Sequence, residues 1–355
     1  MAEHKSPINV LIAEDSPTSR ELLTHVLNSD PGLRVIGVVN NGEQSVRAVI
    51  NRKPDIVVMD VHMPVMDGFE ATRRIMSTHP VPVVIVSETF EDLAAATFAA
   101  LEAGALAFIR HPPGPGHPDH VTAAIELRTM IRLMADIKVV RRWARRDYQQ
   151  AVQKNNYTGI PTETGDVRLV AIGASTGGPI VLQSILTAIA PVLNVPVLVV
   201  QHIAMGFVRS FADLLGATGL QVHIATDGEK TLPGHVYLAP EDLHMGIDSS
   251  GRIKLGKTGP EHGMRPSVSY LFRSVARSMG NNAIGVLLSG MGKDGADGLK
   301  LMKDQGALTI VQDEKTSDVY GMPAEAVNLG AADYVFGPQE IVEKIKSSLT
   351  HRPNI

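Results

Sequence analysis

Short apolar runs that alternate with amphipathic stretches are the feature that most constrains this chain. One series starts at Ile8 and continues to about residue 130, and a second starts at Val167. Such alternation is typical of parallel βα units, in which a helix returns the chain to the same edge of a sheet. With 355 residues, the chain is long enough for two domains of this kind. We therefore predict a two-domain α/β protein.

The apolar runs also set the expected strands and the domain bounds. In the first series we expect strands at residues 8–13, 35–39, 56–59, 83–86 and 107–109. Five such strands predict a flavodoxin-like (βα)5 sheet over residues 1–130. In the second series we expect strands at residues 167–172, 195–200, 221–225, 235–238, 283–288 and 308–312. They predict a larger doubly wound domain with a mostly parallel sheet over residues 166–350, joined to the first by a linker at 131–165.

Composition narrows the class of protein. The chain has no cysteine, so thiol nucleophiles, disulfides and cysteine-ligated metals are excluded, and serine, histidine and carboxylates must carry any chemistry. A net charge of -4 argues against a protein built to coat nucleic acid, and the basic run at residues 138–146 is interpreted as a solvated linker helix. No apolar run is long enough to span a bilayer. We expect a cytoplasmic protein that is not inserted in the membrane.

Three carboxylates follow strands of the first domain. Glu14 and Asp15 come after the first expected strand and Asp60 after the third. Because the carboxyl ends of parallel strands share one edge of the sheet, these groups should meet there. Carboxylate oxygens are ligands that Mg²⁺ prefers, so the cluster predicts a magnesium site with Asp60 available as a phosphoryl acceptor. The alternative is a set of solvated loop residues, with Asp60 capping the following turn.

A serine turn opens the second domain. Gly173, Ser175 and Gly177 satisfy G-x-S-x-G, the pattern of a nucleophile on a tight strand-to-helix turn. A serine needs a base, and His202 follows the very next strand, at the same edge of the sheet. Asp294, in a glycine-rich loop after a later strand, is the expected orienting carboxylate.

The remaining polar candidates of this domain are weaker. Asp297 is the alternative carboxylate, which would instead cap the outgoing helix. His244 and His262 are expected in polar loops, where solvation is the default, and His223 and His235 within strands. The structural alternative for the serine motif itself is a tight turn of small residues without a chemical role.

Four motifs of the first domain occur together in a known order. IAEDSPTSR, VVMDVHMPVMDGFEATRRI, VIVSETF and GALAFIRHPP resemble the receiver domain of two-component response regulators. The resemblance implies that Asp60 is the phosphoacceptor and that Glu14, Asp15, Asp60 and the backbone carbonyl of His62 hold Mg²⁺. It also implies that Ser87 is the switch hydroxyl and Phe108 the aromatic switch position. One departure is His111, which stands where receivers normally have lysine.

Seven motifs of the second domain point to one family. GASTGGP, VVQHI, GFVRSFADLL, VYLAPEDLHM, RPSVSYLF, LLSGMGKDGADGL and YGMPAEAV resemble the catalytic domain of the CheB family of chemotaxis protein-glutamate methylesterases. The resemblance implies Ser175 as nucleophile, His202 as base and Asp294 as orienting carboxylate. It further implies that Thr176 supports the site and that the backbone N–H of Met291 contributes to the oxyanion hole. The segment HIAMGF departs from the family's proline-containing sequence.

The two resemblances together imply an activity and its partners. The implied reaction is hydrolysis of glutamate methyl esters, with deamidation of glutamines, on methyl-accepting chemoreceptors in a chemosensory pathway. A chemotaxis histidine kinase would be the phosphodonor, Mg²⁺ would serve the receiver, and the esterase site would need no cofactor. Three alternatives stay open: a DNA-binding response regulator, a serine hydrolase with another substrate, and an esterase whose receiver no longer responds to phosphorylation.

Overall fold

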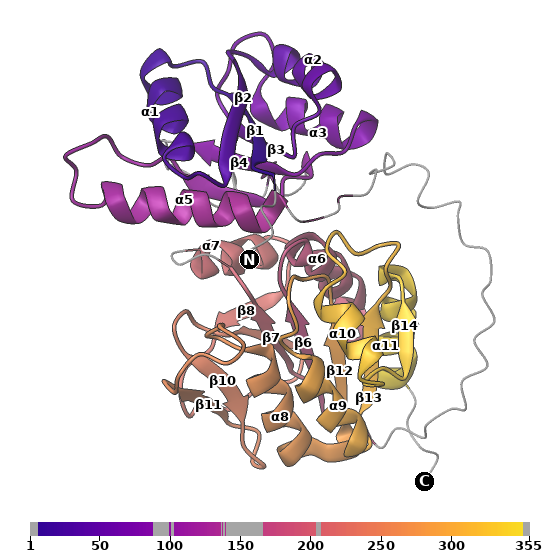
Figure 1. The fold of residues 1–355 in the computed structure, drawn as a ribbon. Helices are drawn as coiled ribbons and strands as arrows, with labels where there is room; N and C mark the ends of the chain where they lie inside the picture. Colours follow the sequence, from indigo (N-terminus) through magenta and orange to yellow (C-terminus); the bar gives the residue numbers. More distant parts are fainter. Residues whose placement is uncertain are drawn as a thin grey trace. The chain divides into compact units, whose positions relative to one another are not determined.

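The computed structural model describes residues 6–87, 99–100, 103–135, 137, 139, 166–203 and 207–350. Its contacts divide the chain into two units, residues 1–154 and 155–355, and each unit contains a parallel sheet with helices on both faces (Figure 1). The predicted basic linker helix lies outside the described residues, as do residues 204–206 of the HIAMGF segment.

The first unit has a five-stranded sheet in the order β2-β1-β3-β4-β5, with every pair parallel. Its strands are β1 (Ile8–Ala13), β2 (Leu33–Val39), β3 (Ile56–Asp60), β4 (Val83–Ser87) and β5 (Ala107–Arg110). Its described helices are α1 (Pro17–Asn28), α2 (Gly42–Arg52), α3 (Gly68–Thr78) and α5 (His120–Ala135). This order confirms the predicted flavodoxin-like fold, because the chain changes direction beside β1 and leaves a crevice at the carboxyl ends of β1 and β3.

Local sequence explains where these elements start. β3 and β4 are continuous apolar runs, as strands covered on both faces should be, and nearly all of their residues are buried. Ser16 caps α1 with its hydroxyl, and Pro17 follows at the first helical position. Asp67 caps α3 by accepting from the N–H of Glu70.

The second unit has a seven-stranded parallel sheet in the order β14-β13-β12-β6-β7-β9-β8. Its strands are β6 (Leu169–Ala174), β7 (Val197–Gln201), β8 (Gln221–Ile224), β9 (His235–Leu238), β12 (Ala283–Leu287), β13 (Leu308–Gln312) and β14 (Tyr334–Phe336). Its helices are α6 (Gly178–Ile189), α7 (Val208–Gly216), α8 (Val268–Met279), α9 (Ala296–Asp304), α10 (Met322–Asn328) and α11 (Pro338–Thr350). The sheet confirms the predicted doubly wound class. β6 is central, with β7 on one side and β12 on the other, so the topological switch point lies at its carboxyl end.

An antiparallel pair, β10 (His244–Ile247) and β11 (Ile253–Gly256), was not expected from the sequence. β10 and β11 have four residues each, and β14 at the sheet edge has three, so each is too short to give a clear periodic signal in the sequence. The expectation that His244 is solvated in a polar loop was wrong, since its exposed fraction is 0 %.

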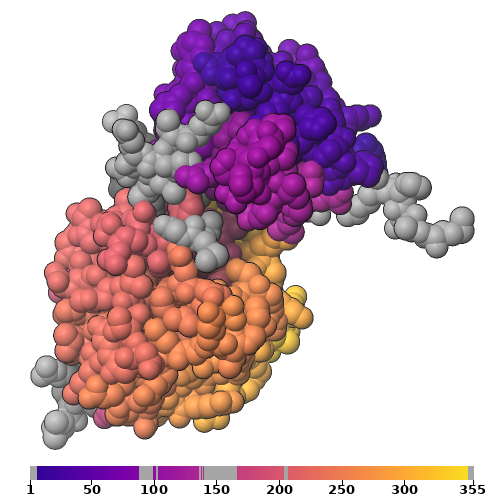
Figure 2. All heavy atoms as spheres, turned by 90° about the vertical axis from the view of Figure 1, so that its left-hand side faces the viewer, coloured from indigo at the N-terminus to yellow at the C-terminus, as the bar shows by residue number. Residues whose placement is uncertain are grey.

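In the space-filling view, residues of the salmon-to-orange part of the chain form much of the visible face of this unit (Figure 2).

None of the helices in the described part of the chain is both long enough and apolar enough to cross a lipid bilayer.

Candidate active site and acidic site

Ser175 lies directly after β6, at the switch point of the sheet. Its N–H donates to the carbonyl of Ser289 (3.0 Å), and its own carbonyl accepts from the N–H of Gly178 (2.8 Å) at the start of α6. Between them, Gly177 has a φ of 78°, in the left-handed region that glycine tolerates best. A Cβ at Gly177 would also lie 2.6 Å from the Cβ of Asp318. The turn therefore requires glycine for two reasons.

A second loop approaches the serine from β12. A Cβ on Gly290 would lie 2.7 Å from the Cβ of Ser175, so only glycine lets this backbone come so close. Ser289 fastens the loop to the serine turn, because its hydroxyl donates to the carbonyl of Thr176 (2.8 Å). The N–H groups of Thr176 and Met291 have no protein acceptor among the residues that the structure describes. Two backbone donors near the serine are thus available to a ligand.

His202 follows β7, the strand beside β6. Its N–H donates to the carbonyl of Ala174 (2.9 Å), which places it next to the serine turn. Its Nε2 lies 2.9 Å from Oδ2 of Asp294, and both side chains are at most 5 % exposed. The structure thus joins two of the three predicted residues directly. Within the described residues no hydrogen bond joins the Ser175 hydroxyl to His202, whose Nδ1 is not used by Asp294.

Asp294 is surrounded by donors at the N-terminus of α8. Its carboxylate accepts from the hydroxyl of Ser267 (2.7 Å) and from the N–H groups of Val268 (2.7 Å) and Ser269 (3.0 Å). Burial opposes ionisation, but the hydrogen bond and charge of His202, with the donors from Ser269 and Ser267, lower the pKa of Asp294 to about 2. The carboxylate is therefore ionised at neutral pH and accepts the proton on Nε2 of His202. This leaves Nδ1 as the ring nitrogen that can accept a proton.

His244 holds Ser267, one of the residues that donate to Asp294. Its Nδ1 accepts from the N–H of Ser267 (3.2 Å), so its Nε2 must donate to the carbonyl of Gly259 (3.0 Å). The ring also stacks on Tyr270 with 4.7 Å between centroids. His244 is thus held as one neutral tautomer that fixes the residue capping α8.

Asp297, the alternative carboxylate, is used differently from either prediction. It lies in the first turn of α9, whose N-cap is Gly295, and it accepts from the hydroxyl of Ser269. The Nε2 of His262 lies 3.4 Å from Asp297, and side-chain exposures of 26 % and 49 % place this pair near the surface. Asp297 therefore braces α8 against α9 and does not contact His202 among the described contacts.

The acidic cluster of the first unit also forms as predicted. One carboxylate oxygen each from Glu14, Asp15 and Asp60 lies within 4.8 Å of the others. Burial raises the pKa of Asp60, and the charge of Asp15 raises it further against hydrogen bonds from the N–H groups of Val61 and His62. Closely spaced oxygen ligands whose ionisation is mutually unfavourable are the donor set that a hard divalent cation stabilises. The residues present therefore fit Mg²⁺.

Of the remaining predicted receiver residues, Ser87, His111 and His62 lie at the same edge of the sheet, and Phe108 lies within a strand. Ser87 ends β4 and is 3 % exposed, and its carbonyl accepts from the N–H of His111 (3.0 Å). The ring of His111 is buried, with Nδ1 3.0 Å from the carbonyl of Pro112 and Nε2 3.9 Å from Glu14. Phe108 is buried in β5. His62 is exposed after β3.

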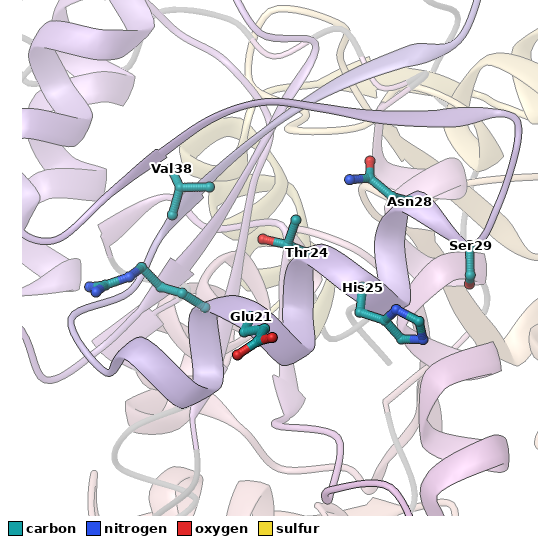
Figure 3. A pocket seen from close by; sticks show the side chains of 7 residues that line it. Glu21, Thr24, His25, Asn28, Ser29 and Val38 are labelled. Carbon is teal, nitrogen blue, oxygen red and sulfur yellow. The ribbon is translucent and has the colours of Figure 1, made fainter.

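A groove of about 590 Å³ lies elsewhere on the first unit, between α1 and Val38 of β2 (Figure 3). It is lined by the α1 residues Arg20, Glu21, Thr24, His25 and Asn28, and by Ser29, which follows the helix. None of the predicted site residues lines it, and we assign it no part in the chemistry.

Sequence reasoning missed the residues that orient Asp294 and the serine turn. The supporting contacts come from Ser267, Ser269, Ser289 and His244. No role of their own was predicted for the three serines, and His244 was expected to be a solvated loop residue. A serine directly before a helix was the available signal, because such a residue caps the helix. Its bond to a carboxylate some 27 positions away could not be read from local pattern.

Comparison with known proteins finds one family match within each unit. Residues 170–345 match the family model described as CheB methylesterase, and residues 10–126 match the response regulator receiver domain. A protein-glutamate methylesterase/protein-glutamine glutaminase of Nitrosospira multiformis is 46 % identical over 97 % of this chain and 96 % of its own. A protein of the same name from Syntrophus aciditrophicus is 48 % identical over 94 % and 96 %. The Thermotoga maritima CheB methylesterase catalytic domain covers 52 % of this chain and 99 % of its own, at 37 % identity and a TM-score of 0.49. The family match assigns residues 170–345 to the methylesterase family, which is the class of output domain that the second set of motifs implies.

Proposed function

Because the chain belongs to the CheB family of methylesterases and carries a receiver domain before the catalytic one, we propose that Ser175, His202 and Asp294 form its catalytic triad. The reaction is hydrolysis of γ-glutamyl methyl esters on chemoreceptors to glutamate and methanol. The relatives' names also support deamidation of glutamine by the same residues. The observation that carries the assignment is the buried contact of 2.9 Å between His202 and Asp294, beside the turn that presents Ser175.

The chemistry follows from the tautomer of His202. Its Nε2–H is held by the ionised Asp294, so Nδ1 accepts the proton when the Ser175 hydroxyl attacks the ester carbonyl. The N–H groups of Thr176 and Met291 stabilise the oxyanion that forms. Nδ1–H then protonates the departing methoxide, and methanol leaves. A water molecule then attacks the acyl-enzyme by the same route, and glutamate is released. When the substrate is glutamine, ammonia leaves in the first step in place of methanol.

The receiver regulates this reaction through Asp60. The carboxylate of Asp60 accepts the phosphoryl group, and the hydroxyl of Ser87 donates to one of its oxygens. Mg²⁺, held by Glu14, Asp15, Asp60 and the carbonyl of His62, would neutralise charge on that group when bound. We assign residues 1–130 to the switch, 131–165 to the connection and 166–350 to catalysis. The phosphodonor is a chemotaxis histidine kinase, and the protein acts in the cytoplasm on the receptors' cytoplasmic helices.

The test is release of labelled methanol from receptor-containing membranes, with and without Mg²⁺ and a small phosphodonor. Ser175→Ala should abolish release, while Ser184→Ala, an exposed serine on α6, should not. Asp60→Asn should remove the stimulation by phosphodonor and keep the basal rate. Release that survives Ser175→Ala would overturn the triad, and stimulation that survives Asp60→Asn would overturn the switch.

A further inference from the structure

Gln201 is the last residue of β7 and stands one position before His202. Its partner across the sheet is Ala174, which stands one position before Ser175. The side chain is buried, with 7 % of the residue exposed. The amide therefore lies between the two backbones that carry the proposed nucleophile and base.

Both hydrogens of this amide are used on those backbones. Nε2 donates to the carbonyl of Ser175 (2.9 Å) and to the carbonyl of His202 (2.8 Å). The opposite orientation of the amide would place Oε1 against two carbonyl oxygens, so the hydrogen bonds fix which atom is nitrogen. A single side chain thus cross-links the two residues through the main chain.

The oxygen of the same amide is less well satisfied. Oε1 of Gln201 is buried and has no hydrogen-bond partner in the described structure. It faces Gly178 at the start of α6, where a Cβ would lie 2.7 Å from Oε1 and where the positive end of the helix dipole favours an oxygen. A methionine would fill this space without leaving a buried acceptor unsatisfied. A methionine could not supply the two hydrogen-bond donors, so the need for these donors explains why glutamine stands at this position.

The bond to Ser175 also sets the direction of an oxyanion donor. The Ser175 carbonyl and the Thr176 N–H belong to one planar trans peptide, so they point in opposite directions. The carbonyl is held on one side by Gln201 and by the N–H of Gly178 (2.8 Å). The Thr176 N–H, which has no acceptor among the described residues, is thereby held pointing away from them.

We infer that Gln201 is a positioning residue that locks the Ser175–Thr176 peptide with its N–H available to the oxyanion, and keeps His202 in register with it. The inference rests on the proposed function of Ser175. Because one misplaced oxyanion donor typically costs a factor of ~10² to 10³ in kcat, Gln201→Met should lower kcat about 100-fold and leave KM nearly unchanged.

The matched control is Thr309→Val. Like Gln201, Thr309 is buried and is hydrogen-bonded through its side chain, in this case to Asp333, but it lies near the start of β13, away from the carboxyl edge. Both variants should melt at a lower temperature than the parent, and only Gln201→Met should lose kcat. Gln201→Glu, which keeps the shape and loses the donors when ionised, provides a second test if Gln201→Met does not fold.

The measurements are steady-state kinetics on a small ester and the rate of labelling of Ser175 by a fluorophosphonate, whose phosphoryl oxygen occupies the oxyanion position. We expect both rates to fall together in Gln201→Met and to stay at the parental value in Thr309→Val. A folded Gln201→Met or Gln201→Glu with parental kcat overturns the inference alone, provided that Ser175→Ala is inactive. An active Ser175→Ala overturns the proposed function, and this inference with it.

Discussion

At the scale of single residues, the acidic site of the first unit and the candidate active site of the second depend on carboxylates in contrasting environments. Asp294 is buried yet ionised, because donors surround it, and its pKa falls to about 2. Asp60 is partly buried beside other carboxylates, and its pKa is raised. The first carboxylate is thus ready to orient a histidine, while the second is poised to receive a cation and a phosphoryl group.

Replacing Asp294 with asparagine tests the first environment. The amide keeps the size of the side chain but presents no anion to Nε2 of His202, so the ring loses its tautomer preference and the stabilisation of its charged form. We expect kcat to fall by a factor of ~10³ to 10⁴ with little change in KM. Steady-state kinetics on a small ester measure this, and a loss below tenfold would contradict the assigned role.

Replacing Asp60 with asparagine tests the second. The pKa of Asp60 is raised in the folded state, so ionisation of Asp60 lowers the stability of the fold. This loss of stability is complete above the folded-state pKa and absent below the unfolded-state pKa. Asp60→Asn should therefore raise the melting temperature of the first unit at pH 7 without Mg²⁺, and reduce the further stabilisation by added Mg²⁺. Scanning calorimetry with and without Mg²⁺ measures both effects. Asp119→Asn, at an exposed carboxylate, is the control and should change neither.

At the scale of elements, the N-terminus of α8 holds the carboxylate of Asp294. Ser267 caps this helix by accepting from the N–H of Tyr270 and also donates to Asp294, so one residue serves the helix and the site. The first turn of α8 adds two backbone donors, and the dipole of the helix favours the carboxylate. The helix and the carboxylate of Asp294 therefore stabilise each other.

Ser267→Ala should weaken both. The loss of a cap costs about 1 kcal/mol of stability, and the loss of a donor raises the pKa of Asp294. Because the pKa of Asp294 is lowered in the folded state, its ionisation stabilises the fold at every pH above the unfolded-state pKa. This stabilisation is lost as the pH falls toward about 2. The acid unfolding of the second unit should therefore start at a higher pH in Ser267→Ala. Urea unfolding between pH 2 and 7 measures this shift, and Ser278→Ala in the last turn of α8 should not produce it.

At the scale of the whole molecule, one chain carries both the proposed phosphoacceptor Asp60 and the proposed triad. Each lies at the carboxyl edge of its own parallel sheet, near the strand where the chain changes direction. Signal transfer then depends on how firmly the receiver holds its phosphoryl group. We expect His111 to limit this hold, because its Nδ1 lies 3.0 Å from the carbonyl of Pro112 and its side chain is shorter than the lysine usual at this position.

His111→Lys should strengthen the response. A lysine ammonium adds a full charge and a charge-assisted hydrogen bond to the phosphoryl group, worth ~1.5 to 3 kcal/mol. We expect the ratio of stimulated to basal methanol release to rise about tenfold at subsaturating phosphodonor. Adding Asp60→Asn should cancel the gain, and an unchanged ratio would show that His111 does not limit the switch.

Sequence by itself determined the two α/β classes, most strands and the residues that end them. These features are local, since an apolar run makes a strand and parallel strands deliver Ser175, His202, Glu14 and Asp60 to predictable edges. Only the tertiary structure decided which groups orient them. Ser267, His244 and Gln201 act through contacts with residues far along the chain or across the sheet, and no periodicity encodes such contacts. The burial of His244 was misjudged for the same reason, because a polar side chain enters a core only where the fold supplies its partners.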